Sequence, residues 1–206
     1  MLNTVIFLTA SLVYKRMEQK KIGILGGTFN PIHLGHLIMA EQALSQLKLD
    51  KVLFMPDYLP PHIDHKDTID AFDRINMIKL AIADNSNFKL ETIEVDRGGK
   101  SYSFDTMVQL TKNHPNNDYY FIIGGDMVEY LPKWYRINDL LKMVTFVGVK
   151  RLGNKVETEY PVKWISSPLI DISSTYVRNS ILHHRDLRYL VPNQVLNYIK
   201  ENGLYE

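Results

Sequence analysis

Apolar positions follow two different periods along the chain from residue 20 onwards. Short apolar runs at 21–25, 52–55, 119–123, 144–149 and 162–165 have the length and composition of buried strands. Between them, apolar residues recur at helical spacing, at Leu37, Ala40, Leu44 and Leu47 and again at Ala71, Ile75, Ile78 and Ile82. The pattern also predicts a strand over 88–95, a short helix ending at Leu110 and capped by Ser103 or Asp105, and helices over 137–143, 173–182 and 193–202, the last closed by Gly203.

Alternation of strands and helices predicts an α/β fold in which a doubly wound parallel sheet carries helices on both faces, followed by C-terminal helices. Ligands on such sheets bind beyond the carboxyl ends of the strands. Three turns follow predicted strands, the paired glycines at 26–27, the prolines at 60–61 and the Gly-Gly-Asp turn at 124–126. We therefore expect the functional site where these turns meet.

Composition narrows the class of protein. The 206 residues suit one domain with a full core, and a net charge of +1 argues against a broad basic face for nucleic acid. There is no cysteine, so disulfides, thiolate nucleophiles and cysteine-ligated zinc are excluded. This composition fits a reducing compartment, and we expect a cytoplasmic protein.

Residues 1–16 do not fit the rest of the pattern. The apolar stretch at 5–13 is far shorter than the roughly 20 residues that span a bilayer, and no basic residue precedes it. We expect a leader or an expression-derived extension over 1–16, a single domain over 17–206, and no membrane partner.

The first strand runs into a segment suited to bind phosphate, residues 22–36, which read IGILGGTFNPIHLGH. Glycines let backbone amides approach a phosphate closely, and a helix start adds unpaired N–H groups with partial positive charge. His33 and His36 lie three residues apart, so both imidazoles can reach the same phosphate oxygens. The segment predicts a nucleoside triphosphate site.

Other interpretations of this segment remain open. It completes neither the G-x-G-x-x-G fingerprint nor a G-x-x-x-x-G-K-[ST] loop, which argues against a dinucleotide-dependent dehydrogenase and a P-loop ATPase. His33 and His36 could simply cap the helix. They could also form a four-histidine metal site with His62 and His65, which have the same spacing but lie in a polar loop.

A second helix start, residues 172–178 (ISSTYVR), has related chemistry. Its hydroxyl side chains are N-cap types beside free amides, and Arg178, one turn later, can present a fork of donors to phosphate oxygens. An ordinary serine cap with a solvated arginine is the alternative. Together with the first segment, we expect two helix starts to hold one triphosphate from opposite sides.

These segments, GGTFNP at 26–31, HLGH at 33–36 and ISSTYVR at 172–178, resemble the nucleotidyltransferase superfamily with the HxGH signature, whose fold is Rossmann-like. Within it the chain is similar to the bacterial nicotinate-nucleotide adenylyltransferases from about residue 17 to the end. PPH at 60–62, SYSFDT at 101–106, IGGDM at 123–127, LPKW at 131–134 and ENGLY at 201–205 carry this closer likeness.

The resemblance implies that AMP passes from ATP to the 5′-phosphate of nicotinate mononucleotide, giving deamido-NAD and pyrophosphate in NAD biosynthesis. It implies catalytic roles for His33, His36 and Arg178. It implies ATP contacts at Gly26, Gly27, Thr28, Phe29, His33, His36, Ser174, Thr175 and Arg178, and mononucleotide contacts at Tyr102, Ser103, Asp126 and Trp134. Mg²⁺ would be held by phosphates and water rather than by side chains, and a homodimer is common in the family.

Several points stay open at the level of the sequence. Trp134 could be an ordinary core residue and Asp126 an N-cap. Ile63 stands where the family usually has a basic residue, and the loop at 56–70 suits a mobile lid. Rival functions are transfer to phosphopantetheine or glycerol phosphate, a class I aminoacyl-tRNA synthetase (which the short chain and a missing KMSKS segment disfavour), and a nucleotide sensor without turnover.

Overall fold

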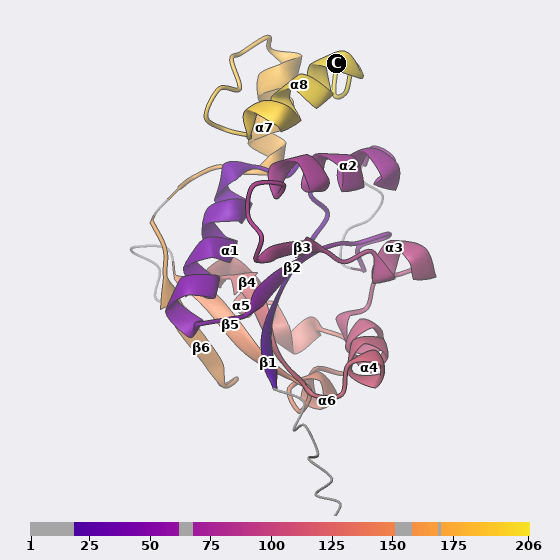
Figure 1. Ribbon diagram of the computed structural model, residues 1–206, viewed down its shortest axis with the longest axis vertical. Helices are drawn as coiled ribbons and strands as arrows, with labels where there is room; N and C mark the ends of the chain where they lie inside the picture. The colour runs from indigo at the N-terminus through magenta and orange to yellow at the C-terminus, as the bar shows by residue number, and fades with distance from the viewer. Residues whose placement is uncertain (1–18, 62–67, 151–157, 169) are drawn as a thin grey trace, which may run out of the picture.

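The computed structural model describes residues 19–61, 68–150, 158–168 and 170–206 (Figure 1). The expected extension at 1–16 lies outside these residues, as do His62, Ile63 and His65. All the strands and helices predicted from the sequence lie within the described ranges.

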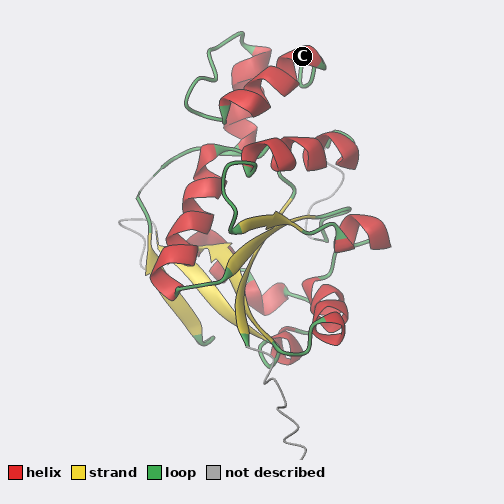
Figure 2. Cartoon of the chain, viewed as in Figure 1, coloured by secondary structure: helices red, strands yellow, loops and turns green. Residues whose placement is uncertain are grey.

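One sheet of six strands forms the centre of the molecule (Figure 2). The strands are β1 (Lys20–Gly27), β2 (Lys51–Pro56), β3 (Phe88–Leu90), β4 (Asn117–Gly124), β5 (Val144–Lys150) and β6 (Val162–Ser166). They lie in the order β3-β2-β1-β4-β5-β6, and every pair is parallel. The predicted doubly wound parallel sheet is confirmed, with its change of winding direction between β1 and β4.

Helices cover both faces of the sheet, as predicted. They are α1 (Leu34–Leu47), α2 (Ala71–Ala81), α3 (Ile93–Arg97), α4 (Ser103–Asn113), α5 (Gly125–Val128), η1 (Leu131–Lys133), α6 (Ile137–Leu140), α7 (Ser174–Leu182) and α8 (Asn193–Glu201). Side chains of α1, α2, α7 and α8 pack in one apolar cluster, and those of α3 to α6 pack in a second on the opposite face. Figure 1 shows α7 and α8 beyond α2, far from α4 and α6.

Alternation along the central strands explains the two clusters. Ile24 and Phe121 face the α4 side, whereas their neighbours Leu25 and Ile122 face the α1 side, and all four are buried. A strand buried on both faces reads as a continuous apolar run, which is why its position could be predicted from the sequence.

The predicted strand over 88–95 is wrong in its second half. Only Phe88–Leu90 pair with β2, and α3 begins at Ile93. Glu91 turns the chain, since its carboxylate accepts the Ile93 N–H at 3.1 Å, and Glu94 and Asp96 in the first helical turn suit a helix N-terminus. Apolar residues at 93 and 95 gave a strand-like pattern that these polar interactions override.

Three smaller predictions also need correction. Neither Ser103 nor Asp105 caps α4, because Tyr102 occupies the N-cap position and the helix runs on to Asn113. The helix predicted over 137–143 ends at Leu140. By contrast, Ser173 caps α7, and Gly203, at a φ of +56°, follows α8 as predicted.

Among the described helices, none has the length and apolar character needed to cross a membrane.

Candidate active site

A cleft of about 420 Å³ opens over the carboxyl ends of β1 and β4, beside the point where the sheet changes winding direction. This size is within the range of small-molecule sites. Both sequence motifs contribute to its walls. Among the lining residues are Gly26, Gly27, His33, His36, Asp126, Trp134 and Ser174.

The turn after β1, residues 28–31, is held by the strand next to it. The Gly27 carbonyl accepts the Asp57 N–H at 3.1 Å, and the Thr28 hydroxyl donates to Asp57 Oδ2 at 2.8 Å. Phe29, at a φ of +49°, buries its ring edge-on against His36, 4.9 Å between centroids. The side chains of Thr28 and Phe29 therefore build the turn and do not line the cleft.

The two histidines at the start of α1 are stacked, with ring centroids 3.7 Å apart. The His33 N–H donates to His36 Nδ1 at 3.2 Å, so the neutral His36 ring carries its proton on Nε2. Burial, with a smaller contribution from the charge of His33, lowers the pKa of His36 well below 6.5. His36 is thus a neutral ring with one N–H to donate.

The start of α7 lies directly against the turn after β1. Ser174 Oγ donates to the Pro31 carbonyl at 2.8 Å, and Arg178 Nη1 donates to the Asn30 carbonyl at 2.7 Å. The predicted convergence of the two helix starts is therefore present, although about 140 residues separate them in the chain.

Not every predicted ATP contact faces the cleft. Thr175 and Arg178 lie behind the turn, where Arg178 Nη2 also donates to Thr175 Oγ1 at 3.2 Å. Ser174 lines the cleft, but its hydroxyl proton is used by Pro31. In this geometry the α7 side chains hold the turn, and contact between Arg178 and a phosphate stays a prediction.

An aromatic wall forms the other end of the cleft. Trp134 is half-buried and packs edge-on against Phe121 and Phe146, 5.6 Å from each between centroids. It also lines the cleft, so it is a core residue with a surface in the cleft, and its contact with the mononucleotide stays a prediction. Tyr102 and Ser103 lie in the same wall, and the Tyr102 ring packs 4.8 Å from that of Tyr135.

Asp126 lines the cleft from α5. The alternative that it caps this helix is wrong, because Gly124 occupies the N-cap position and Asp126 follows two residues later. Its carboxylate folds back over Gly124, where an added β-carbon would lie 2.5 Å from Asp126 Oδ1. The glycine at 124 leaves the space that this carboxylate uses.

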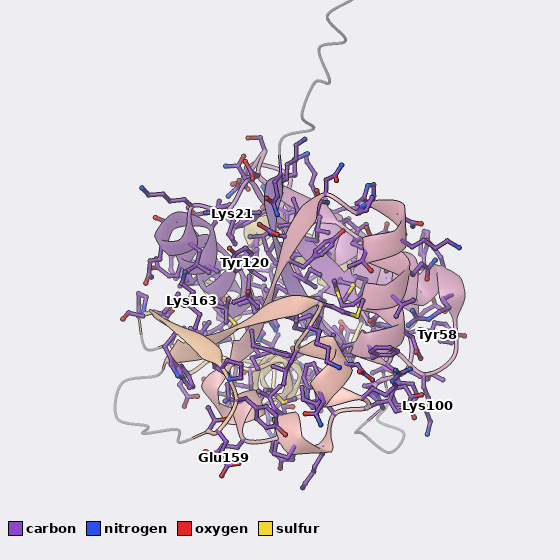
Figure 3. All side chains as sticks on the ribbon, turned by 90° about the horizontal axis from the view of Figure 1, so that it is seen from below. Lys21, Tyr58, Lys100, Tyr120, Glu159 and Lys163 are labelled. Carbon is purple, nitrogen blue, oxygen red and sulfur yellow. The ribbon has the colours of Figure 1, made fainter. Side chains whose placement is uncertain are left out.

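Two loops flanking the cleft are joined to each other. The Ser101 N–H donates to the Leu59 carbonyl at 2.9 Å, and Ser101 Oγ accepts the Tyr58 N–H at 2.9 Å. Figure 3 shows Tyr58 and Lys100 on the same side of the molecule, as this pairing requires. The prolines at 60–61 are thereby placed next to the SYS segment at 101–103.

Three buried charged residues near the cleft were not predicted, Asp57, Arg74 and Glu94. Arg74 comes from α2 and donates to the Thr28 and Asp57 carbonyls at 2.8 and 2.9 Å, and it forms an ion pair with Asp57 at 3.4 Å. Burial raises the pKa of Asp57 more than its Thr28 hydrogen bond and the charge of Arg74 lower it. In the sequence, Arg74 is one polar residue among the apolar positions of a helix, so its contacts with Thr28 and Asp57 could not be predicted and are seen only in the fold.

Glu94 is the third of these groups and lines the cleft from α3. Its carboxylate accepts the buried Thr106 hydroxyl at 2.7 Å, and Arg97 donates to the same hydroxyl at 2.9 Å. Burial raises the pKa of Glu94, and the hydrogen bonds from Thr106 and Ser101 oppose this shift.

Beside the glycine turn the cleft is lined by the imidazoles of His33 and His36, a chemistry that suits phosphate oxygens better than a cation. Within the described ranges, no three histidine or carboxylate side chains gather as a metal site would require. The four-histidine alternative needs His62 and His65, which lie outside those ranges.

A parallel sheet in this order, with a cleft at its switch point and the starts of α1 and α7 beside it, is typical of nucleotidyltransferases. Comparison with known proteins agrees. The model of the family described as cytidylyltransferase-like matches residues 24–180.

Curated bacterial proteins cover nearly the whole chain. A protein of Lactiplantibacillus plantarum named "Probable nicotinate-nucleotide adenylyltransferase" is 59% identical over 92% of this chain and 90% of its own length. A protein of Enterococcus faecalis with the same name is 54% identical over 91% of this chain and 86% of its own length. The chain belongs to the cytidylyltransferase-like family and, within it, to the nicotinate-nucleotide adenylyltransferases.

The fold agrees with a solved structure as well. The Plasmodium falciparum nicotinic acid mononucleotide adenylyltransferase complexed with NaAD superposes with a TM-score of 0.78 over 91% of this chain and 98% of that one, at 20% identity.

Proposed function

We propose that the protein transfers AMP from ATP to the 5′-phosphate of nicotinate mononucleotide, producing deamido-NAD and pyrophosphate. The observation that carries the proposal is the contact between the two helix starts, Ser174 to Pro31 and Arg178 to Asn30, beside a cleft that Ser174 and Trp134 both line. Relatives of 54–59% identity carry the corresponding name.

The reaction needs little acid–base chemistry from the protein. A phosphate monoester has its second pKa near 6, so the attacking oxygen is already anionic near neutral pH. This oxygen forms a bond to the α-phosphorus, the bond from that phosphorus to the bridging oxygen breaks, and the electron pair leaves with pyrophosphate. Catalysis then depends on alignment and on stabilising charge on the transferring and leaving phosphates.

His36 is suited to this stabilisation. A neutral ring with its proton on Nε2 donates one hydrogen bond to a phosphoryl oxygen and stays fixed through the His33 N–H. We assign the phosphate contacts to His33, His36 and the amides of the glycine turn, and a further contact to Arg178.

The aromatic wall is the proposed place of the pyridine ring. Trp134 lines the cleft, and its T-shaped contacts with Phe121 and Phe146 restrict its side chain, so stacking on it costs little side-chain entropy. Tyr102, Ser103 and Asp126 complete this half of the proposed site.

A divalent ion, Mg²⁺ in our proposal, would neutralise charge on the triphosphate when bound. In this proposal phosphate oxygens and water supply its ligands, and Asp57 is already used by Thr28 and Arg74. The proposal also places the protein in the cytoplasm. It includes a homodimer as the oligomeric state, which analytical ultracentrifugation would test.

Pyrophosphate release with ATP and one of four acceptors tests the function. The acceptors are nicotinate mononucleotide, nicotinamide mononucleotide, phosphopantetheine and glycerol phosphate. We expect the highest kcat/KM with nicotinate mononucleotide, together with deamido-NAD as product. Turnover only with phosphopantetheine or glycerol phosphate would overturn the proposal, and ATP binding without turnover would favour a nucleotide sensor.

A further inference from the structure

The turn after β1 is held by three side chains from other elements. Its carbonyl oxygens at Thr28, Asn30 and Pro31 accept hydrogen bonds from Arg74 of α2, Arg178 of α7 and Ser174 of α7, at 2.8, 2.7 and 2.8 Å. All three donors come from outside the turn.

Fixing the Thr28 and Pro31 carbonyls also fixes the amides that follow them, whereas the Asn30 carbonyl is followed by Pro31, which has no N–H, so its bond fixes only the path of the chain. The C=O and N–H of a trans peptide point in opposite directions from one rigid plane. A bond to the Thr28 carbonyl therefore sets the direction of the Phe29 N–H, and a bond to the Pro31 carbonyl sets that of the Ile32 N–H. Phe29 and Ile32 are both buried, so these bonds act on the cleft through the path of the turn into α1, where His33 and His36 line the cleft.

Tyr205, after α8, reaches the same turn. Its hydroxyl donates to Asn30 Oδ1 at 2.8 Å, and Asn30 is only 4% exposed. Leu204 and Tyr205 pack on the apolar cluster of the α1 face. Burial raises the pKa of Tyr205, and the nearby charges of Arg178 and Arg74 oppose that shift only in part, so the hydroxyl keeps its proton at neutral pH.

We propose that Tyr205 is a positioning residue for ATP. By holding the Asn30 side chain while Arg178 holds the Asn30 carbonyl, it keeps the turn at 28–31 in its binding geometry. The segment after α8 thus contributes to nucleotide affinity without touching the nucleotide. This inference rests on the proposed function for its kinetic readout only.

A nearby tyrosine supplies a matched control. Tyr198 lies in α8, and its hydroxyl donates to Asp73 Oδ1 at 2.8 Å and accepts from Asn76 at 3.1 Å, both in α2. Each of the variants Tyr198→Phe and Tyr205→Phe removes one tyrosine hydroxyl near the C-terminus. The first loses hydrogen bonds to α2, and only the second loses a hydrogen bond to the turn.

We expect Tyr205→Phe to raise KM for ATP by about three- to tenfold, the range that corresponds to one lost hydrogen bond. KM for nicotinate mononucleotide should stay within about twofold. Tyr198→Phe should leave both KM values unchanged, although the two variants lose similar thermal stability. Calorimetric titration with α,β-methylene-ATP should show the same ratio as a change in Kd.

The inference fails if Tyr205→Phe has the same KM and Kd for ATP as Tyr198→Phe. It also fails if Tyr205→Phe raises KM for ATP and for nicotinate mononucleotide by the same factor. Should the unmodified protein release no pyrophosphate with any acceptor, the proposed function fails instead. The calorimetric Kd values then decide the inference alone, since weaker binding by Tyr205→Phe only would still support it.

Discussion

At the scale of single residues, the environment of His36 fixes both the charge and the tautomer of its ring. His36 accepts the His33 N–H on Nδ1, and burial keeps its ring neutral. The hydrogen bond from the His33 backbone N–H therefore decides which ring nitrogen of His36 is the donor.

Replacing His36 by Ala should lower kcat for pyrophosphate release by about 10²-fold or more, because a fixed donor to a charged transition state is lost. His183→Ala is the control, since His183 is exposed and lies at the far end of α7. Initial-rate assays at saturating ATP compare them. Equal rates for both variants would remove His36 from the mechanism.

His36 should also shape the dependence of stability on pH. Its pKa in the folded protein lies below the 6.5 of the unfolded chain, so the unfolded state binds a proton first as the pH falls. The stabilisation from the neutral ring is present above pH 6.5 and is lost below it.

Urea unfolding of the wild type and His36→Gln between pH 7.5 and pH 5 measures this effect. The free energy of unfolding of the wild type should fall more steeply below pH 6.5 than that of the variant. Parallel curves would show that His36 is not desolvated as described.

At the scale of elements, the site depends on how helices meet the turn after β1. α2 reaches it through Arg74 and α7 through Ser174 and Arg178. Removing Arg74 would leave the Asp57 carboxylate buried and without its ion pair.

Arg74→Met should therefore lower the free energy of unfolding by about 3–5 kcal/mol at neutral pH. Arg188→Met breaks an ion pair with Asp186 whose side chains are both about two-thirds exposed, and should cost about 0–1 kcal/mol. Chemical denaturation compares them. A loss for Arg74→Met no greater than for Arg188→Met would contradict the role given to this pair.

The same scale shows what the sequence could predict. Long apolar runs such as β4 and periodic helices such as α1 were placed correctly, because burial on a sheet or along one helix face leaves a periodic trace. α3 was missed, since Ile93 and Val95 alternate like a strand while the deciding interaction is the Glu91 hydrogen bond.

At the scale of the whole molecule, the motifs predicted which segments meet beside the cleft but not the side chains that hold them there. Glycine turns and helix starts have local signatures, so the convergence of residues 26–36 with 172–178 could be expected. Arg74, Glu94 and Tyr205 act through tertiary contacts with no local signature. Their roles follow only from the way α2, α3 and the segment after α8 pack around the cleft.

A crystal structure with α,β-methylene-ATP would show directly whether the two helix starts hold a triphosphate. We predict the triphosphate between the first turns of α1 and α7, with a phosphate oxygen within hydrogen-bond distance of His36 Nε2. A triphosphate bound elsewhere on the protein, with these helix starts contacting no phosphate, would contradict the proposed site.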